Sequence, residues 1–405
     1  MTSPRNVVIG VTGGIAAYKA CHLVRDFKEA GDSVRVVPTE NALQFVGAAT
    51  FEALSGNPVD TGVFTRVDSV QHVRIGQEAD LIIVAPATAD IIARIAAGRA
   101  DDLLTSTILV ATCPVVLAPA MHTEMWVNPA TQANVATLRQ RGMTVLEPAD
   151  GRLTGKDSGP GRMLEPGQIA ELARTVAEVG AIGRGLEGKR VLISAGGTQE
   201  NIDPVRFIGN RSSGRQGFAL AEIAAQRGAE VTVVAGDINE LYTPAGAEIV
   251  RVRSTRELEE EMNARAAGAD IIVMAAAVSD FRPRTEAPSK MKKGADTEAL
   301  ARIELVENPD VLHGLVDKRR AGETDAVIVG FAAETDNPLE YGKEKLARKG
   351  ADMLMVNSVA GGAVFGQARN SGWLVGSDGT VTEIADGPKQ VVAAQIWDAI
   401  EDFER

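Results

Sequence analysis

Short apolar runs alternate with longer amphipathic stretches along the chain, and this alternation starts twice. In the first half, the β-branched runs that predict strands are residues 7–11, 34–37, 81–85, 115–118 and 144–146. These runs are apolar throughout, as expected for strands buried on both faces of a parallel sheet. Residues 15–30 and 129–141 predict helices between them. The order of elements predicts βαβ units.

The alternation stops at residues 149–167, which are rich in Gly, Pro and Asp and predict a loop. A single amphipathic helix is predicted over residues 168–179. The joint that follows, residues 180–190, is rich in Gly and charge. We therefore expect two domains, residues 1–185 and 186–405.

A second series then begins. Its strand candidates are residues 191–194, 231–235, 271–274, 327–331 and 353–356. Lysines and prolines in residues 282–294 predict a mobile loop, and Ser-Asp-Gly at the centre of residues 373–384 predicts a hairpin. Residues 389–403 predict the last helix. The predicted fold class is α/β, with two Rossmann-like doubly wound domains that share a layout but little sequence.

Composition narrows the classes of function. The net charge of −12 argues against a general affinity for nucleic acid or for an anionic membrane. Two cysteines suit neither a disulfide framework nor a zinc site, and they favour a reducing cytoplasm. The first residues lack a signal-peptide pattern, and no apolar run reaches the ~18–20 residues that span a bilayer. We therefore expect a cytoplasmic protein.

Two turns of the first half follow predicted strands. In residues 10–15, GVTGGI, glycines let backbone N–H groups approach an anion at a helix start. The spacing is not GxGxxG, so the dinucleotide signal is weak. Thr39 follows the second strand, where a hydroxyl suits a phosphate or ribityl group better than a nicotinamide ribose. A tight turn without a ligand is the simpler alternative for both.

The chain has four histidines. His22 and His313 lie within predicted helices and are interpreted as structural. His72 lies between a loop and an apolar stretch, and His122 follows a predicted strand. A lone histidine is more often structural than catalytic, so the sequence by itself leaves the role of His72 open.

Motifs in residues 9–163 carry a family resemblance. GVTGGIAAYK, the His72 segment, APATAD, AGRADDLL and PAMHTEMW are similar to the homo-oligomeric flavin-containing cysteine decarboxylases, above all to the phosphopantothenoylcysteine decarboxylase branch. The resemblance implies that FMN is the cofactor and that His72 is the catalytic base. It implies that FMN is bound by Thr12, Gly13, Gly14, Thr39, Pro86, Thr88 and Ser106.

The implied chemistry explains the flavin. A cysteinyl carboxylate has no electron sink for decarboxylation, so electrons are taken from the thiol before CO2 leaves and are returned afterwards. Two positions depart from the family pattern: His122 replaces an asparagine that contacts the substrate carboxylate, and Gly155 replaces a proton-donating cysteine. We hypothesise that His122, or a group on the loop Lys156–Asp157, donates that proton.

The second half concentrates glycines, hydroxyls and arginines ahead of a predicted helix, in residues 195–200, 203–206 and 210–217. This combination predicts a polyphosphate site, and the alternative is a glycine-rich loop with surface arginines. Lys290, with its neighbouring lysines, is either a solvated charge cluster or a lid over phosphates.

AGGTQENIDPVRFIGNRSSG, MAAAVSDF, SKMKK, ENPDVL, GFAAET and KLARK, within residues 190–358, resemble phosphopantothenate–cysteine ligase. The resemblance implies 4'-phosphopantothenate, L-cysteine and CTP as substrates, with Mg2+ held mainly by the triphosphate. It implies that Asn210 acts on an acyl-cytidylate and that Arg206 and Lys290 assist. The CTP residues that it implies are Ser212, Gly214, Met274, Ala275, Ala276, Asp280, Lys290, Asn308, Pro309, Asp310, Val311, Phe331, Lys345 and Lys349.

Together the two resemblances imply successive steps of coenzyme A biosynthesis, in trimeric decarboxylase and dimeric ligase units. A rival for the second half is a reductase that binds NADPH, because Tyr341 and Lys345 have the spacing of short-chain dehydrogenases and Asp237 follows a strand. A non-catalytic flavoprotein regulator and a prenyl-transferring flavin enzyme are further alternatives; the latter does not explain the second half.

Overall fold

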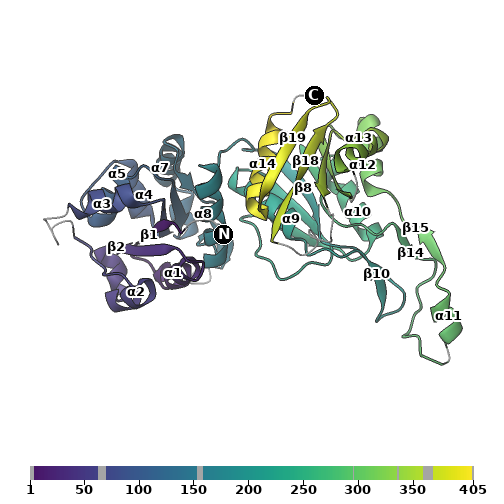
Figure 1. Cartoon of the computed structure of the whole chain (residues 1–405), viewed down its shortest axis with the longest axis horizontal. Coiled ribbons are helices and arrows are strands. Elements are labelled where there is room, and N and C mark those ends of the chain that lie inside the picture. The colour runs from purple at the N-terminus through teal and green to yellow at the C-terminus, as the bar shows by residue number, and fades with distance from the viewer. Residues whose placement is uncertain are drawn as a thin grey trace. The chain divides into compact units, whose positions relative to one another are not determined.

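The computed structural model describes residues 4–62, 70–152, 158–294, 296–334, 337–358 and 368–403. The chain divides into two compact units, Met1–Gly183 and Arg184–Arg405, and each has its own sheet (Figure 1). Within the described ranges, no helix combines the length and apolar character needed to cross a bilayer.

The first unit is built on a five-stranded parallel sheet of order β2-β1-β3-β4-β5. Its strands are β1 (Asn6–Val11), β2 (Ser33–Pro38), β3 (Leu81–Ala87), β4 (Val115–Pro119) and β5 (Thr144–Val145), which confirms the five predicted strands. Its helices are α1 (Ala20–Glu29), α2 (Ala48–Ser55), α3 (Gln71–Glu78), α4 (Ala89–Ala96), α5 (Leu103–Val110), α6 (Thr123–Trp126), α7 (Pro129–Gln140) and α8 (Pro166–Val179). The strand order reverses between β1 and β3, which opens a crevice at their carboxyl ends.

The single helix predicted over residues 15–30 is wrong at its start. A 3-10 helix, η1 (Ile15–Lys19), precedes α1. Gly14 is the N-cap and makes no side-chain cap bond, while Ala17 N donates to Gly14 O at 2.9 Å, so the tight exit from β1 is closed by an i to i+3 bond.

The loop predicted over residues 149–167 is also wrong, because it contains an antiparallel hairpin. Its strands are β6 (Ala149–Arg152) and β7 (Ser158–Arg162). Gly151 and Gly159 pair in this ladder with φ of +143° and +152°, a backbone region that favours glycine. A ladder that contains a pair of glycines and no β-branched residue carries no sequence signal for a strand.

The second unit has an eight-stranded sheet of order β12-β11-β8-β13-β16-β17-β18-β19. The strands are β8 (Arg190–Ala195), β11 (Glu230–Ala235), β12 (Glu248–Arg251), β13 (Ile271–Met274), β16 (Val327–Glu334), β17 (Met353–Ser358), β18 (Arg369–Gly376) and β19 (Val381–Pro388). The first six in this order are parallel, and β18 and β19 join antiparallel as the predicted hairpin. The sequence missed β12, an edge strand with exposed Glu248 and Arg251 at its ends.

Helices lie on both faces of this sheet, which confirms the doubly wound fold (Figure 1). They are α9 (Arg215–Gln226), α10 (Thr255–Ala266), α12 (Val311–Arg320), α13 (Pro338–Lys349) and α14 (Lys389–Glu401). Helix α9 packs against α14, and α10 packs against α12. The buried Arg227 guanidinium joins the first pair, because it contacts Asp398 and Glu401 at 2.6 Å each.

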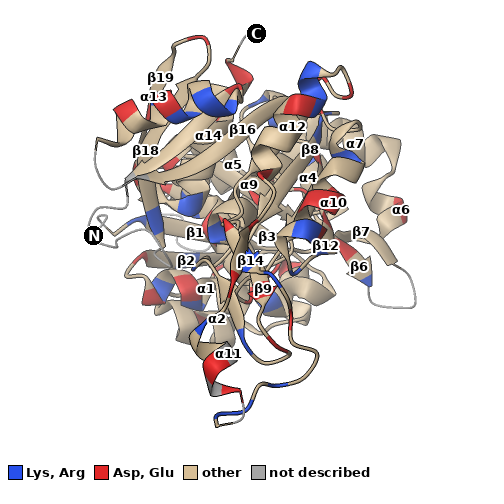
Figure 2. Ribbon diagram, turned by 90° about the vertical axis from the view of Figure 1, so that its right-hand side faces the viewer, with Lys and Arg blue, Asp and Glu red and all other residues tan. Residues whose placement is uncertain are grey.

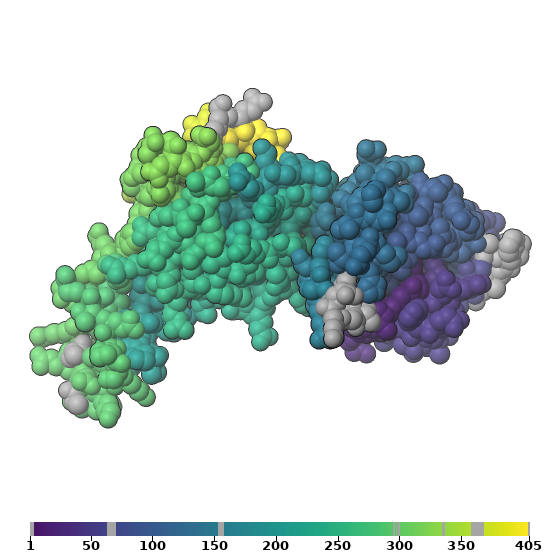
Figure 3. Space-filling view, turned by 180° about the vertical axis from the view of Figure 1, so that it is seen from behind, coloured from purple at the N-terminus to yellow at the C-terminus, as the bar shows by residue number. Residues whose placement is uncertain are grey.

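Two short antiparallel ladders lie outside the sheet. One pairs β9 (Gln199–Asn201) with β10 (Phe207–Gly209), and the other pairs β14 (Phe281–Pro283) with β15 (Leu305–Glu307). The segment from β14 to β15 carries α11 (Thr297–Ala301) and extends away from the body of the second unit (Figures 1 and 3). Basic and acidic positions both occur along it (Figure 2). The loop predicted over residues 282–294 is therefore wrong at its first residues, which belong to β14, and its mobility stays a prediction.

Asp203 ties the turn between β9 and β10 to the lysine-rich segment. Its carboxylate accepts hydrogen bonds from Val205 N and Arg206 N at 2.8 Å each, from the Arg206 guanidinium at 2.6 Å and from Met291 N at 3.2 Å. Burial by itself raises the pKa of Asp203, but these three backbone donors and Arg206 outweigh it, and the pKa lies below its ordinary value. Asp203 is therefore an ionised tether next to Lys290.

We expect Asp203→Asn to release this segment, because the amide cannot accept all of these bonds. Trypsin cleavage after Lys290, Lys292 and Lys293 should become about threefold to tenfold faster, measured by mass spectrometry of timed digests. A lowered pKa means that the tether is complete above the ordinary Asp value and is lost only as the pH falls through the lowered value. The wild-type cleavage pattern should therefore show no titration of Asp203 between about pH 6 and 9.

Asp378→Asn is the matched control, since Asp378 also accepts bonds within a turn, from Thr380 N at 2.9 Å and Thr380 Oγ1 at 2.6 Å. It should leave cleavage at the lysine-rich segment unchanged. Equal digestion of wild type and Asp203→Asn would show that Asp203 does not hold the segment.

Candidate functional sites

The first site is a cavity of about 620 Å³ at the carboxyl ends of the first-unit strands. Loops after β1, β2, β3 and β4 meet there, and the β6–β7 hairpin closes one side. The lining residues are Thr12, Gly13, Gly14, Ile15, Ala16, Tyr18, Lys19, Thr39, Asn41, Thr88, Ala89, Asp90, Ile91, Arg94, Ala120, Met121, His122, Met125, Arg152, Gly161, Arg162 and Met163.

Thr12 links the loops after β1 and β3. Its Oγ1 donates to Pro86 O at 2.7 Å and accepts from Thr88 N at 3.3 Å. Thr88 is in turn the N-cap of α4 and accepts from Ile91 N at 3.4 Å. These bonds fix two helix starts side by side, and helix starts favour anions.

Close backbone approaches shape the rest of this cavity. A Cβ on Gly13 would lie 2.5 Å from Asn41 Cβ, so only glycine fits between the loops after β1 and β2. Gly161 of β7 has a φ of +136°, and a Cβ there would lie 2.4 Å from Met121 O. Met121 N donates to Gly161 O at 3.0 Å. The hairpin is therefore held against the segment that carries His122.

Arg94 supplies a fixed cation to the wall. Its guanidinium contacts Asp101 and donates to Asp102 at 2.8 Å. Burial lowers the pKa of Arg94, but the hydrogen bonds to Asp101 and Asp102 outweigh it and raise the pKa above its ordinary value. The aspartates of the AGRADDLL motif thus hold Arg94 in place. The sequence analysis did not identify Arg94 as a site residue.

The predicted flavin residues divide between the cavity and its surroundings. Thr12, Gly13, Gly14, Thr39, Thr88 and the exposed His122 line the cavity, whereas Pro86 and Ser106 do not. His72 also lies outside it, on α3, and its Nδ1 is buried without a hydrogen-bond partner among the described residues. Gly155 and Lys156–Asp157 fall outside the described residues.

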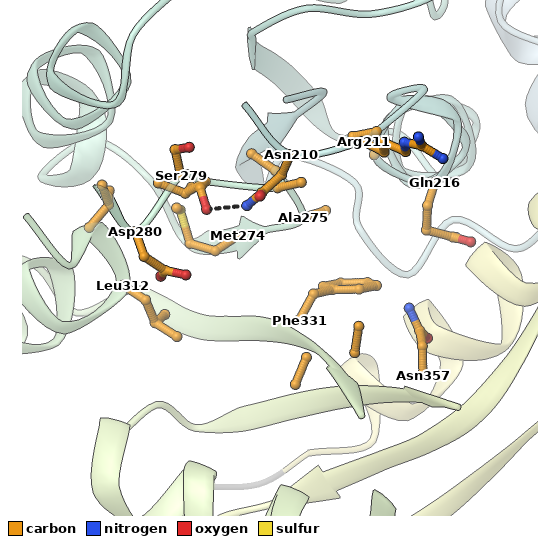
Figure 4. Close-up of a pocket in the computed structure, with 18 of the residues that line it drawn as sticks. Asn210, Arg211, Gln216, Met274, Ala275, Ser279, Asp280, Leu312, Phe331 and Asn357 are labelled. Atoms are coloured by element: carbon orange, nitrogen blue, oxygen red, sulfur yellow. Dashed lines mark hydrogen bonds between the residues drawn. The ribbon is translucent and has the colours of Figure 1, made fainter. Parts of the chain in front are cut away.

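The second site is a cavity of about 900 Å³ at the carboxyl ends of β13, β16 and β17. It is lined by residues 210–217, 274–281, 307–312 and 331–333, and by Lys345, Lys349, Leu354, Asn357, Asn370 and Lys389. Asp280 and Leu312 lie on one side of the Phe331 ring, and Gln216 and Asn357 lie on the other (Figure 4). The cavity therefore has two ends.

A buried polar network supports the Asp280 end. The carboxylate of Glu200 accepts from Thr255 N at 2.9 Å and from Thr255 Oγ1 at 2.8 Å. Asn308 Nδ2 donates to Ser279 O at 2.9 Å, and Asn308 Oδ1 accepts from Arg282 at 2.9 Å. Both sides of the Asn308 amide are therefore fixed before any ligand binds.

Two further side chains of the cavity wall are fixed by contacts with neighbouring residues. The exposed Asn210 donates from Nδ2 to Val278 O at 2.7 Å (Figure 4). Lys349 forms an ion pair with Asp310, the N-cap of α12. Burial acts to raise the pKa of Asp310, but Lys349 and the bond from His313 N outweigh it and lower the pKa. Lys349 thus has an internal counter-ion.

All predicted CTP residues except Lys290 line this one cavity, and Arg206 lies outside it with Lys290. Sequence reasoning missed Asn357, Asn370 and Lys389, whereas Gln216 lies in the predicted polyphosphate segment 210–217. Asn357 follows a predicted strand, so the rule that ligands gather at carboxyl strand ends could have found it. Tyr341 is 48% exposed and does not line the cavity, whereas Lys345 does, so the reductase pair of Tyr341 and Lys345 does not face this cavity together.

Among the described residues, no group of three His, Cys, Asp or Glu side chains is placed to hold a metal ion.

Comparison with known proteins assigns both halves. The family described as "Flavoprotein" matches residues 1–178, and the family described as "DNA/pantothenate metabolism flavoprotein C-terminal domain" matches residues 186–403. The coenzyme A biosynthesis bifunctional protein CoaBC of Mycolicibacterium smegmatis is 56% identical over 410 residues, which cover 100% of this chain and 99% of that protein.

Two solved structures are also similar. The C-terminal domain of a coenzyme A biosynthesis bifunctional protein CoaBC is 35% identical, covers 54% of this chain and 97% of its own, and has a TM-score of 0.46. A PPC decarboxylase mutant complexed with pantothenoylaminoethenethiol is 31% identical, covers 43% of this chain and 99% of its own, and has a TM-score of 0.40. From the full-length relative and the two matched families, this chain belongs to the bifunctional coenzyme A biosynthesis proteins, with a flavoprotein decarboxylase unit followed by a ligase unit.

Proposed function

We propose that the second unit joins 4'-phosphopantothenate to L-cysteine with CTP, and that the first unit decarboxylates the product with FMN. The observation that carries the ligase proposal is the convergence of the motif residues on one cavity beside the start of α9. The charge pattern and the two cysteines favour a cytoplasmic location.

The ligation needs an activated carboxylate, because a carboxylate itself resists attack by an amine. One oxygen of the phosphopantothenate carboxylate attacks the α-phosphorus of CTP, and pyrophosphate leaves. The cysteine amine then attacks the acyl carbon, the C–N bond forms, and CMP leaves. Asn210 stands at the cavity wall with Nδ2 already bonded to Val278 O, which orients the amide toward the acyl-cytidylate.

Lys290 lies outside the cavity, next to the residue that Asp203 tethers. We propose that the lysine-rich segment closes over the triphosphate and places a cation beside the departing pyrophosphate, with Arg206 at its base. Mg2+ would be carried by the triphosphate, which suits a cation that keeps several non-protein ligands.

The first-unit cavity fits FMN. Its volume is in the range of small-molecule sites, Thr39 offers a hydroxyl, and Gly14 leaves the wall bare because a Cβ there would meet only Thr88 Cγ2, at 3.6 Å. The bound flavin supplies reversible two-electron chemistry at the substrate thiol. The chain's own residues place the substrate carboxylate and move protons. His122 lines the cavity and is our candidate for the donor that the family finds in a cysteine.

His72 lies on α3 and does not line the cavity of its own subunit. Gly76 fixes α3 against α5: a Cβ at this position would lie 2.6 Å from Thr107 O. We propose that His72 acts on the flavin site of a neighbouring subunit, in trimeric decarboxylase units. The ligase units would be dimeric.

We expect the purified protein to form CMP, pyrophosphate, CO2 and 4'-phosphopantetheine when it is given 4'-phosphopantothenate, cysteine and CTP. Chromatography and mass spectrometry detect these products. ATP in place of CTP should be the poorer substrate. Asn210→Ala and Lys290→Gln should slow CMP formation at least about tenfold, because each removes a group that acts in the transition state. Both should keep the decarboxylation of supplied phosphopantothenoylcysteine. A colourless protein that takes up no FMN and consumes no CTP would contradict the proposal.

His122→Asn is expected to keep decarboxylation but to slow the final protonation, since an amide is not an acid near neutral pH. An unsaturated product, the enethiol, should then accumulate and be detected by mass spectrometry, whereas wild type should give only the saturated thiol. Turnover unchanged in His122→Ala would exclude this role.

Mixed oligomers test the position of His72. His72→Asn and Gly13→Leu should each lack decarboxylase activity, the first without its base and the second with a blocked flavin site. Co-expression of the two variants should restore activity, because a site between one wild-type flavin cavity and one wild-type His72 forms only in mixed assemblies. Oligomers with no recovered activity, shown by differential tags to be mixed, would place His72 in its own subunit's site.

A further inference from the structure

Lys389 is a buried cation that opens onto the second-unit cavity. It is the first residue of α14, directly after β19, and is only 7% exposed. It nevertheless lines the cavity. Among the described residues, its ammonium group has no hydrogen-bond or ion-pair partner. An unpaired buried charge raises the free energy of the folded state. Its position at a cavity wall therefore indicates a role in binding.

The charged group that acts on the pKa of Lys389 is another cation, Arg215. Burial lowers the pKa of Lys389, and repulsion by Arg215 lowers it further. Arg215 also lines the cavity. Two cations that face the same space, without an acidic partner among the described residues, form a site of positive potential. Such perturbed groups in a cleft are typical of functional sites.

The start of α9 adds to this potential. Its N-cap, Gly214, makes no side-chain cap bond, and the first turn contains no acidic residue. A Cβ on Gly217 would lie 2.6 Å from Ala195 Cβ, so α9 begins tightly against β8. The first N–H groups of a helix that lack a cap are anion donors. This helix has 12 residues, long enough for a full dipole.

A set of amides fixes the geometry of this end. Asn370 Nδ2 donates to Gln216 Oε1 at 3.1 Å and to Asn357 Oδ1 at 3.3 Å, and Gln216 Nε2 donates to Lys389 O at 3.4 Å. Gln216 and Asn357 lie on the side of Phe331 that is remote from Asp280 (Figure 4). Lys389 therefore belongs to the end of the cavity away from Asp280.

We propose that Lys389, Arg215 and the start of α9 form a subsite for a substrate phosphate dianion. This subsite rests on the proposed ligase function, and two substrates offer the group: CTP as its terminal phosphate, and 4'-phosphopantothenate as its phosphate monoester. Lys389 is a binding residue at this end, where the motif residue Arg211 also lines the cavity (Figure 4). Its charge is compensated only when the ligand arrives.

Steady-state kinetics of Lys389→Met, which keeps the length and apolar stem of the side chain, separate the two sources. The KM of one phosphate-bearing substrate should rise about tenfold or more, as for the loss of a charge-assisted hydrogen bond, while the KM of cysteine stays within about twofold. A rise for CTP alone assigns the subsite to the nucleotide. A rise for 4'-phosphopantothenate alone assigns it to the phosphate monoester. Lys389→Gln repeats the test should the methionine variant fail to fold.

Thermal unfolding adds a readout that does not need catalysis. Without ligand, Lys389→Met should be at least as stable as wild type, because a buried uncompensated charge is removed. Tripolyphosphate and inorganic phosphate serve as probes, and either one that raises the Tm of wild type should raise that of Lys389→Met less. Lys318→Gln is the control, since Lys318 pairs with Glu323 at 2.8 Å and does not line the cavity. It should match wild type in all these measurements.

Unchanged KM values for both substrates in folded variants would overturn the proposal. A lower ligand-free Tm together with unchanged KM values would show that Lys389 is structural. If wild type released no pyrophosphate from CTP, the proposed ligase function would be rejected. A tripolyphosphate shift present in wild type and lost in Lys389→Met would then still support the anion subsite, and a shift equal in both would reject it.

Discussion

Close backbone approach at the carboxyl ends of the strands, which glycines permit, is the constraint on which both sites depend. In the second unit Gly217 lets α9 begin against Ala195 at the end of β8, and in the first unit Gly13 lets the loops after β1 and β2 touch. A side chain at either position would push the helix start or the loop away. Because glycine has no side chain, backbone N–H groups come within reach of an anion at both positions. The crevice where the strand order reverses provides the space for the ligand.

The two units use this shared layout for different chemistry because different side chains surround the crevice. In the first unit Thr12 and Thr88 link neighbouring loops by hydroxyl bonds, and Arg94 is held by a pair of aspartates. The second unit surrounds its crevice with amides and cations, of which Asn308 is fixed on both sides by the network of Ser279 and Arg282. The fold thus sets where a ligand lies, and the loops set which ligand it is.

Elements with a strong periodic pattern could be predicted from the sequence. The β-branched runs of β1, β3 and β13 are buried on both faces, and their positions match the structure. The hairpin β6–β7 could not be predicted, since its strands contain no β-branched residue and its ladder includes a pair of glycines at positive φ. Motif residues in the second cavity were found through the family resemblance, and some of them, such as Ala275 and Ala276, also follow a predicted strand. Lys389 and Asn370 were missed because they lie on the last helix and the last hairpin, far from α9 in sequence. Only folding brings them into contact with Gln216 of α9.

The ion pair between Lys349 and Asp310 has a consequence for the design of inhibitors. A compound that offers an acid to Lys349 must displace a carboxylate of the same chain, so it exchanges one electrostatic contact for another and loses solvation on the way. A neutral scaffold that leaves this pair intact and packs against the face of Phe331 avoids that exchange. Selectivity would then come from shape and stacking at the aromatic ring rather than from charge.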